Sequence, residues 1–147
     1  MIDGLEYLML YLSYERITGA NMESLDFEQM ITFIYVSDLN ESKIFYEKIM
    51  GFPLRLDQGT CRIVETSKEG GGLLGYCAGN DNPKPASNLI ITLVSSSVDE
   101  WYEYLIDCGV KIPEPPKINH KYKIYHFFFA DPDGYKIEIQ EFRDPAW

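Results

Sequence analysis

The sequence contains an internal repeat, and this repeat restricts the possible folds more than any other feature. Residues 31–36 (ITFIYV) and 89–94 (LIITLV) are apolar runs rich in β-branched side chains, and each is followed by a polar turn. Two buried strands are therefore predicted at equivalent places in the two halves. The repetition of an apolar run followed by a polar turn in both halves indicates a duplicated structural unit.

Each apolar run is followed by the signals of a helix. Asp38 and Ser97 stand at predicted N-caps, each with a glutamate three positions later, which is the spacing of a capping box. Gly51 and Gly109 predict the helix ends, because glycine readily accepts the left-handed conformation found there. The predicted helices span residues 39–50 and 98–108.

Three extended segments with turn signals follow each predicted helix, so each half of the chain is predicted to form a βαβββ unit. The expected fold class is α+β, with modules 28–79 and 88–143 forming a curved mixed sheet around a cavity. Residues 1–27 precede the repeat. Their apolar positions Leu5, Leu8 and Leu12 have helical spacing and predict a short, buried N-terminal helix.

Composition excludes several classes of function. Thirteen basic and 23 acidic side chains give a net charge of −10, which repels nucleic acid and anionic lipid. No apolar run is long enough to span a bilayer. The three cysteines, Cys61, Cys77 and Cys108, form no C-x-x-C pair, so we expect reduced thiols in a cytoplasmic protein.

Three segments form a pattern together, namely residues 38–52, residues 98–110, and the Asp-Pro-Asp-Gly turn of residues 131–134 followed by Glu138. This pattern resembles the vicinal oxygen chelate superfamily, which includes glyoxalase I, bleomycin-resistance proteins and extradiol dioxygenases. The resemblance covers residues 28–143. It implies paired βαβββ modules around a ligand cavity, and it leaves the function open because the same scaffold hosts enzymes and binding proteins.

In the metal-dependent members of that superfamily, the resemblance implies four strand positions that supply metal ligands. The matching positions in this chain are Ile31, Leu89 or Ile90, Gly75 and Glu138. Only Glu138 carries a ligand side chain, whereas a bound divalent ion ordinarily needs three or more. We therefore expect no cofactor. If a divalent metal does bind, Glu138 and His126 are the candidate ligands.

The C-terminal hairpin decides which side chains share a face with Glu138. A four-residue loop over residues 131–134 would pair Phe127 with Glu138 and His126 with Ile139. Strand alternation then places three aromatic side chains on the face of Glu138. These are Tyr125, Phe127 and Phe129. A slip of one residue would reverse the faces and bring His126 to Glu138.

The preferred functional hypothesis is metal-independent binding of a small organic molecule, with Glu138 as polar anchor and the three aromatic side chains as a wall. An acidic, aromatic cavity suits a cationic or aromatic ligand. The alternative is a lyase, isomerase or dioxygenase of the glyoxalase type, which uses a metal or takes Glu138 as its catalytic base. We also expect a homodimer, because a second chain can cover exposed sheet edges.

Overall fold

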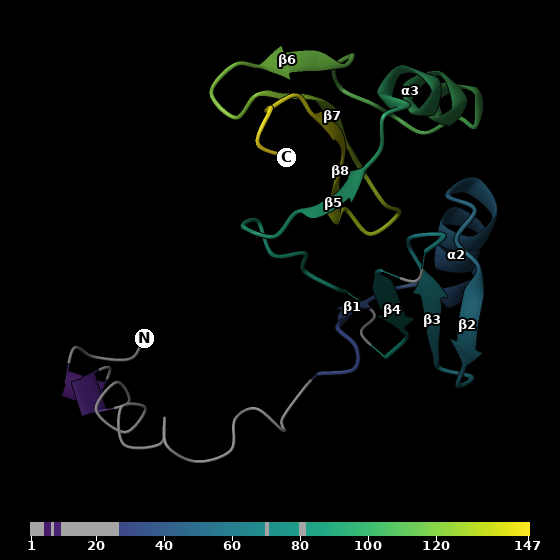
Figure 1. Ribbon diagram of the computed structural model, residues 1–147. Helices are drawn as coiled ribbons and strands as arrows, with labels where there is room; N and C mark the ends of the chain where they lie inside the picture. Colours follow the sequence, from purple (N-terminus) through teal and green to yellow (C-terminus); the bar gives the residue numbers. More distant parts are fainter. Residues whose placement is uncertain (1–4, 7, 10–26, 70, 80–81) are drawn as a thin grey trace. The chain divides into compact units, whose positions relative to one another are not determined.

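The computed structural model describes residues 5–6, 8–9, 27–69, 71–79 and 82–147 (Figure 1). The chain forms two compact units, Met1–Met30 and Ile31–Trp147. In the first unit, Leu5, Glu6, Leu8 and Met9 are helical, as the spacing of the leucines predicts. Leu5 and Leu8 are 73% and 50% exposed, so the prediction that this leucine stripe is buried is wrong for these two residues. Leu12 lies outside the described residues.

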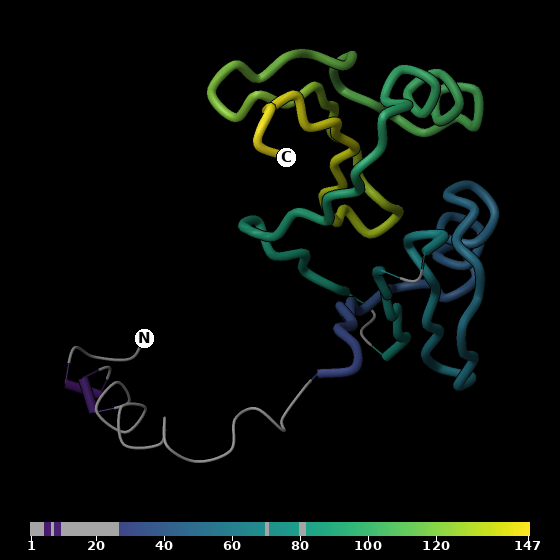
Figure 2. Tube along the Cα trace, viewed as in Figure 1, coloured from purple at the N-terminus to yellow at the C-terminus, as the bar shows by residue number. Residues whose placement is uncertain are grey.

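The second unit consists of two βαβββ modules, in agreement with the repeat. The first module contains β1 (Ile31–Tyr35), α2 (Leu39–Lys43) with a π-helical continuation (Ile44–Ile49), β2 (Leu54–Asp57), β3 (Cys61–Glu65) and β4 (Leu73–Cys77). The second module contains β5 (Ile91–Val94), α3 (Val98–Asp107), β6 (Lys117–Asn119), β7 (Ile124–Ala130) and β8 (Lys136–Phe142). Figure 2 traces the chain from one module to the other. No helix in the described part of the chain is long and apolar enough to cross a membrane.

Each module forms its own four-stranded mixed sheet, in the order β1-β4-β3-β2 in the first and β5-β8-β7-β6 in the second. The first and last strands of each module are parallel neighbours, and the other pairs are antiparallel. Each helix packs against its own sheet (Figure 1). Each sheet therefore has a helix-covered face and an open face. Within the described residues, β1 and β5 are edge strands.

The two predicted N-caps behave differently. The Asp38 side chain accepts hydrogen bonds from the backbone N–H groups of Asn40 and Glu41, at 2.7 and 3.0 Å, as an N-cap should. The side chain of Ser97 makes no capping hydrogen bond. Its backbone N–H instead donates to the hydroxyl oxygen of Ser95 at 3.1 Å, so the predicted second capping box is wrong.

Gly51 and Gly109 end the helical segments in the left-handed conformation, with φ of +69° and +81°. The backbone N–H of Phe52 then turns back and donates to the carbonyl of Tyr46 at 3.0 Å. A side chain at either glycine would strain this backbone conformation. Both predicted helix ends are confirmed.

The helix-covered faces of the two modules contribute to one hydrophobic core. Buried hydrogen bonds also link the modules. The Tyr46 hydroxyl donates to the carboxylate of Asp131 at 2.6 Å, and burial raises the pKa of both groups. The Tyr135 hydroxyl donates to the Tyr35 carbonyl at 2.8 Å. These contacts hold the turn between β7 and β8 against the first module.

Two of the three cysteines form a disulfide. Cys61 and Cys77 lie directly opposite each other where β3 pairs with β4, and their Cα atoms are 4.0 Å apart. The expectation of a reduced thiol is wrong for these two residues, because strand pairing joins positions that are 16 residues apart in sequence. Cys108 is a free, exposed thiol.

Candidate functional site

The hairpin that carries Glu138 has a five-residue loop, one residue longer than predicted. Ala130 pairs with Lys136, which places Phe128 opposite Glu138 and Phe127 opposite Ile139. The predicted pairing of Phe127 with Glu138 is therefore wrong by one residue. Such a shift exchanges the two faces of a strand.

Asp131 and Tyr135 account for the longer loop. The Asp131 carboxylate accepts a hydrogen bond from the Tyr135 N–H at 2.8 Å, and the Asp131 N–H donates to the Tyr135 carbonyl at 3.1 Å. The hydroxyl of Tyr135 is held by the first module, as described above. Tyr135 therefore closes the loop, and strand pairing begins only at Lys136.

The three aromatic side chains proposed as a cavity wall pack on the helix-covered face instead. The ring of Phe127 lies 5.6 Å from that of Tyr102 in α3, and the ring of Phe129 lies 6.4 Å from that of Phe45. The Tyr125 hydroxyl donates to Asp99, also in α3, at 2.6 Å. Strand alternation places these aromatic residues on the face opposite Glu138. Their assignment to the ligand site is corrected accordingly.

His126 takes their place beside Glu138. Its Nδ1 lies 2.6 Å from Glu138 Oε1, and the Thr92 hydroxyl donates to Glu138 Oε2 at 2.9 Å. His126 is 5% exposed and Glu138 is 7% exposed. Three strands contribute to this cluster, because Thr92 in β5 pairs with Glu138 in β8, while His126 comes from β7. The open face of the second module therefore carries a buried polar cluster.

The hydrogen bonds of the cluster fix the roles of the two imidazole nitrogens. With Glu138 ionised and the imidazole neutral, Nδ1 of His126 donates to the carboxylate and the lone pair of the ring is on Nε2. Fully buried side-chain nitrogen and oxygen atoms of the described residues all have hydrogen-bond partners. Nε2 makes no hydrogen bond to the described part of the chain. It must therefore be reachable from outside the protein.

Gln140 adds a second unused polar group on this face. It lies opposite His126 and two positions after Glu138, and it is only 6% exposed. Within the described residues, its side-chain amide has no hydrogen-bond partner. Its amide atoms are not fully enclosed, because every fully buried side-chain nitrogen and oxygen atom of the described residues has a partner. Such a group is expected where a ligand or water completes the hydrogen bonding.

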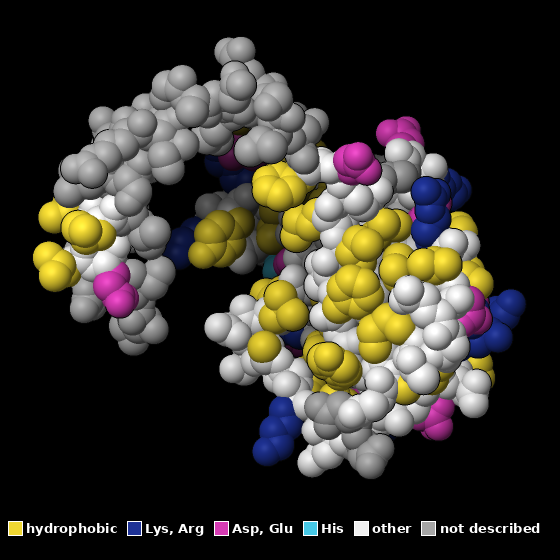
Figure 3. Space-filling model, turned by 90° about the horizontal axis from the view of Figure 1, so that it is seen from below, with side chains coloured by type: hydrophobic (Ala, Val, Ile, Leu, Met, Phe, Trp, Pro, Cys, Tyr) yellow, Lys and Arg dark blue, Asp and Glu magenta, His cyan; other side chains and the backbone are white. Residues whose placement is uncertain are grey.

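An aromatic ring and a small pocket lie beside the polar cluster. Phe128 shares its face, and the ammonium of Lys136 lies 4.0 Å from the centre of the Phe128 ring. His126, Phe128, Lys117 and Lys136 help to line a pocket of about 170 Å³. Figure 3 shows a face of the molecule on which exposed hydrophobic side chains gather. A ligand at the cluster would therefore meet both polar groups and apolar surface.

A larger pocket, of about 380 Å³, lies away from Glu138 and between the modules. Its walls include Met50, Phe52, Leu93 and Trp101. No mostly buried, unpartnered polar side chain lines it among the described residues. Volume alone does not make a binding site, so we place the candidate site at the polar cluster.

The residues at the cluster do not fit a metal ion held by this chain. Within the described residues, no group of three or more His, Cys, Asp or Glu side chains could hold one. In the first module, Gly75 matches the position of Glu138. A Cβ atom at Gly75 would lie 2.3 Å from the Phe33 ring, so that position has no room for a ligand side chain.

Sequence reasoning missed Thr92 and Gln140. Their signal was present, because Gln140 follows Glu138 at the two-residue period of a strand and Thr92 is a polar residue inside an apolar run. Only the pairing of β5, β7 and β8 shows that they meet. Glu138 lies on the open face, as expected, and its role in ligand binding stays a prediction.

The duplicated βαβββ modules define the class of protein to which this chain is related. Residues 29–139 match the Glyoxalase/Bleomycin resistance protein/Dioxygenase superfamily, and the chain belongs to this family. It is 31% identical over 116 residues to the metallothiol transferase FosB of Staphylococcus saprophyticus, a match that covers 71% of this chain and 70% of that protein.

Solved structures show the same fold. The fosfomycin resistance protein FosX from Listeria monocytogenes superposes with a TM-score of 0.63 at 19% identity, over 80% of this chain and 94% of that one. A glyoxalase/bleomycin resistance protein/dioxygenase from Nocardioides superposes with a TM-score of 0.67 at 18% identity, over 90% and 95% of the two chains.

Proposed function

We propose that this protein binds a small polar organic molecule on the open face of its second module. The observation that carries the proposal is the pair of mostly buried polar groups, His126 Nε2 and the Gln140 amide, which have no partner in the described chain. His126 and Gln140 lie opposite each other in the strand pairing, and Glu138, two positions before Gln140 on β8, orients His126. Such groups can form hydrogen bonds with a ligand without first breaking a bond within the protein.

The contacts of the cluster suggest the chemistry of the ligand. Both oxygens of Glu138 already accept hydrogen bonds, so the expectation of a cationic ligand loses its main support. His126 and Gln140 instead suit a ligand with hydroxyl, carbonyl or thiol groups. Phe128 offers one aromatic face for a ring or an alkyl chain. We propose that this binding needs no metal, because the donor set does not fit one.

A second candidate function is enzymatic. The relative from Staphylococcus saprophyticus is named a metallothiol transferase, and similarity to it favours chemistry on a small molecule. The buried pair of His126 and Glu138 also has the geometry of a catalytic acid–base pair. The metal-dependent alternatives are supported less well, because the cluster lacks a third ligand of the usual kind within the described residues.

A thermal-shift screen of metabolites and antibiotics would identify ligands, and two variants would locate their site. Glu138→Gln removes the charge that orients His126, so we expect it to weaken a bound ligand by about 1.5–3 kcal/mol. Glu141→Gln is the matched control, because Glu141 lies on the same strand but on the other face. Calorimetric titration measures both. Equal affinities for wild type and Glu138→Gln would place the ligand elsewhere.

We also propose that a second copy of the chain covers the open faces. Large apolar side chains are exposed on or beside them, with Phe33 53% exposed and Tyr35 58% exposed. Strands β1 and β5 present unpaired backbone groups that a second chain can pair. Sedimentation equilibrium should show a dimer, and Tyr35→Lys should shift it towards monomer. A wild-type protein that stays monomeric at high concentration would contradict this proposal.

A further inference from the structure

The paired arrangement of His126 and Glu138 supports a role beyond ligand contact. We propose that His126 Nε2 accepts a proton from a bound small molecule that carries a thiol or hydroxyl group, and that Glu138 positions and charge-balances the imidazole. The inference rests on the proposed function, because it needs a ligand on the open face of the second module. It assigns a proton-transfer role to a chain whose donor set does not fit a metal.

The geometry prepares one nitrogen for this role. Glu138 is fixed by the Thr92 hydroxyl on one oxygen and by His126 Nδ1 on the other, so the imidazole has a set orientation. The hydrogen bond to Nδ1 leaves the lone pair on Nε2, as described above. Because Nε2 is reachable and has no protein partner in the described chain, its lone pair is free for a ligand.

The proton transfer balances in charge. The ligand O–H or S–H bond breaks, its proton moves to Nε2, and its electron pair stays on the ligand oxygen or sulfur. The imidazolium that forms lies 2.6 Å from the Glu138 carboxylate, which stabilises the new positive charge. The Lys136 ammonium, on the same face as Glu138, provides a positive charge for the anionic ligand. The proton returns to product or to solvent, which restores the neutral ring.

The two histidines of the chain have different surroundings. The chain has two histidines, His120 and His126. His120 lies in the turn between β6 and β7 and is exposed, whereas His126 is buried within the cluster. Any reagent that reports on imidazole reactivity therefore has an internal reference in the same molecule.

Carbethoxylation by diethyl pyrocarbonate tests the assignment without any knowledge of the natural ligand. A neutral imidazole nitrogen attacks a carbonyl carbon of the reagent, and the ethyl carbonate that leaves decomposes to ethanol and carbon dioxide. Peptide mass spectrometry then gives a separate rate for each histidine. We expect His126 to react in the folded full-length protein, at a rate that depends on Glu138.

The variants show whether the reaction rate of His126 depends on the orientation of its imidazole or only on its accessibility to the reagent. In Glu138→Gln, an amide N–H can donate to Nδ1 and force the proton onto Nε2, so we expect the His126 rate to fall about tenfold while the His120 rate is unchanged. Thr92→Val should lower the His126 rate less, because it only loosens Glu138. Glu141→Gln, on the opposite face, should change neither rate. Circular dichroism confirms that each variant is folded.

Two outcomes would overturn the inference. One is a His126 that does not react in the folded wild-type protein, and the other is an equal His126 rate in wild type and Glu138→Gln. Neither result depends on a ligand, so the ligand screen can still succeed and leave the proposed binding function standing. A screen that fails while His126 reacts as expected would instead count against the binding function, and with it against the proton transfer that needs a bound ligand.

Discussion

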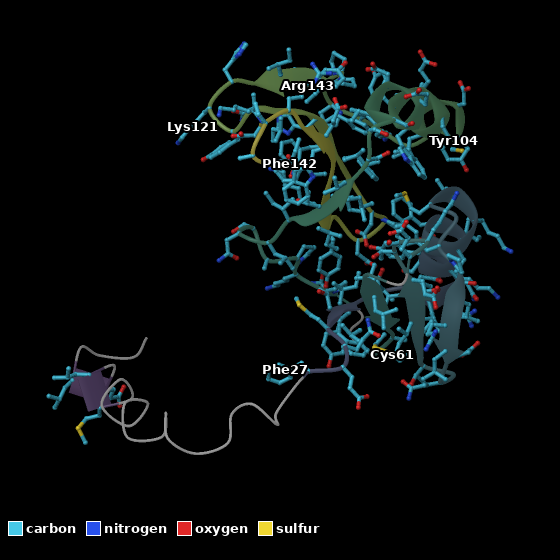
Figure 4. All side chains as sticks on the ribbon, viewed as in Figure 1. Phe27, Cys61, Tyr104, Lys121, Phe142 and Arg143 are labelled. Carbon is cyan, nitrogen blue, oxygen red and sulfur yellow. A yellow bond between two sulfur atoms is a disulfide. The ribbon has the colours of Figure 1, made fainter. Side chains whose placement is uncertain are left out.

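The open faces of the two modules have the same backbone and opposite chemistry. In the first module Phe33 pairs with Gly75, and Cys61 pairs with Cys77. In the second module the matching pairs are Thr92 with Glu138 and His126 with Gln140. Figure 4 labels Cys61 on the first sheet and Phe142 on the second. A ring and a disulfide thus stand where the other module has hydrogen-bonding groups. The duplicated scaffold sets positions, and the side chains decide which copy carries a site.

The helix-covered faces show the reverse contrast. In the first module Arg62 forms two hydrogen bonds to the Glu47 carboxylate, at 2.7 and 3.2 Å, and the Tyr76 hydroxyl donates to the same carboxylate at 2.5 Å. In the second module the positions of Arg62 and Tyr76 are taken by Phe127 and Ile139. Among the described strands, the buried polar side chains therefore lie on the helix-covered face of the first module and on the open face of the second.

The largest expected effect tests which face of β7 is the core. Phe127→Ala should lower the free energy of unfolding by about 3–5 kcal/mol, the usual cost of removing a fully buried ring. Phe128→Ala removes a half-buried ring from the open face and should cost about 1 kcal/mol. Urea unfolding measures both. Similar losses, or a larger loss for Phe128→Ala, would contradict the observed strand register.

The next test removes the buried ion pair of the first module. Arg62→Met leaves Glu47 without its main partner and should cost about 3–5 kcal/mol. Replacing Arg62, Glu47 and Tyr76 together by Met, Leu and Phe makes this face resemble that of the second module, and most of the loss should return. Arg55→Met, at a 65% exposed side chain, is the control and should change little. A triple variant as unstable as Arg62→Met would show that the faces are not interchangeable.

The repeat predicted most of the fold, because local signals determine it. Apolar runs, the Asp38 cap and the glycines at 51 and 109 all act within a few residues of themselves. The site depended on a long-range contact instead. Tyr135 lengthens the hairpin loop because its hydroxyl bonds to Tyr35, 100 positions away in sequence. No local signal in residues 131–134 reports that contact, so the aromatic residues of β7 were assigned to the wrong face.

The disulfide was missed for a similar reason. Cys61 and Cys77 become neighbours only through the pairing of β3 with β4. The sequence between these strands does not indicate where their pairing begins. The sequence shows which side chains of one strand share a face. The register between two strands depends instead on the contacts that fix the turn between them.

Loss of the disulfide should have a moderate effect on stability. This disulfide occupies the positions in the first module that correspond to His126 and Gln140 in the second. Its loss removes a link across 16 residues, for which chain-entropy arguments give about 3 kcal/mol. We expect urea unfolding of the Cys61→Ser/Cys77→Ser double variant to give a free energy of unfolding that is lower by that amount. Cys108→Ser should have no such effect, because Cys108 is a free thiol. If both variants match the wild type, the link contributes nothing to stability.

The smallest effect is the acid sensitivity of the first module. Burial raises the pKa of Glu47, but the hydrogen bonds from Arg62 and Tyr76 and the nearby positive charges together outweigh burial and hold this pKa below its ordinary value. A depressed folded pKa gives stability that is present above the unfolded pKa and lost as pH falls through the folded one. Unfolding free energies between about pH 5 and pH 3 should therefore fall more steeply in wild type than in the triple variant. Equal slopes would remove Glu47 from the acid response.

The central claim is that the open face of the second module binds a small molecule through His126. Nitrogen NMR of protein labelled at histidine gives separate signals for the imidazole nitrogens of His120 and His126. During titration with a ligand from the thermal-shift screen, the account predicts that His126 Nε2 shifts in a saturable manner while both nitrogens of His120 stay in place. Saturable binding that leaves His126 Nε2 unshifted would contradict it.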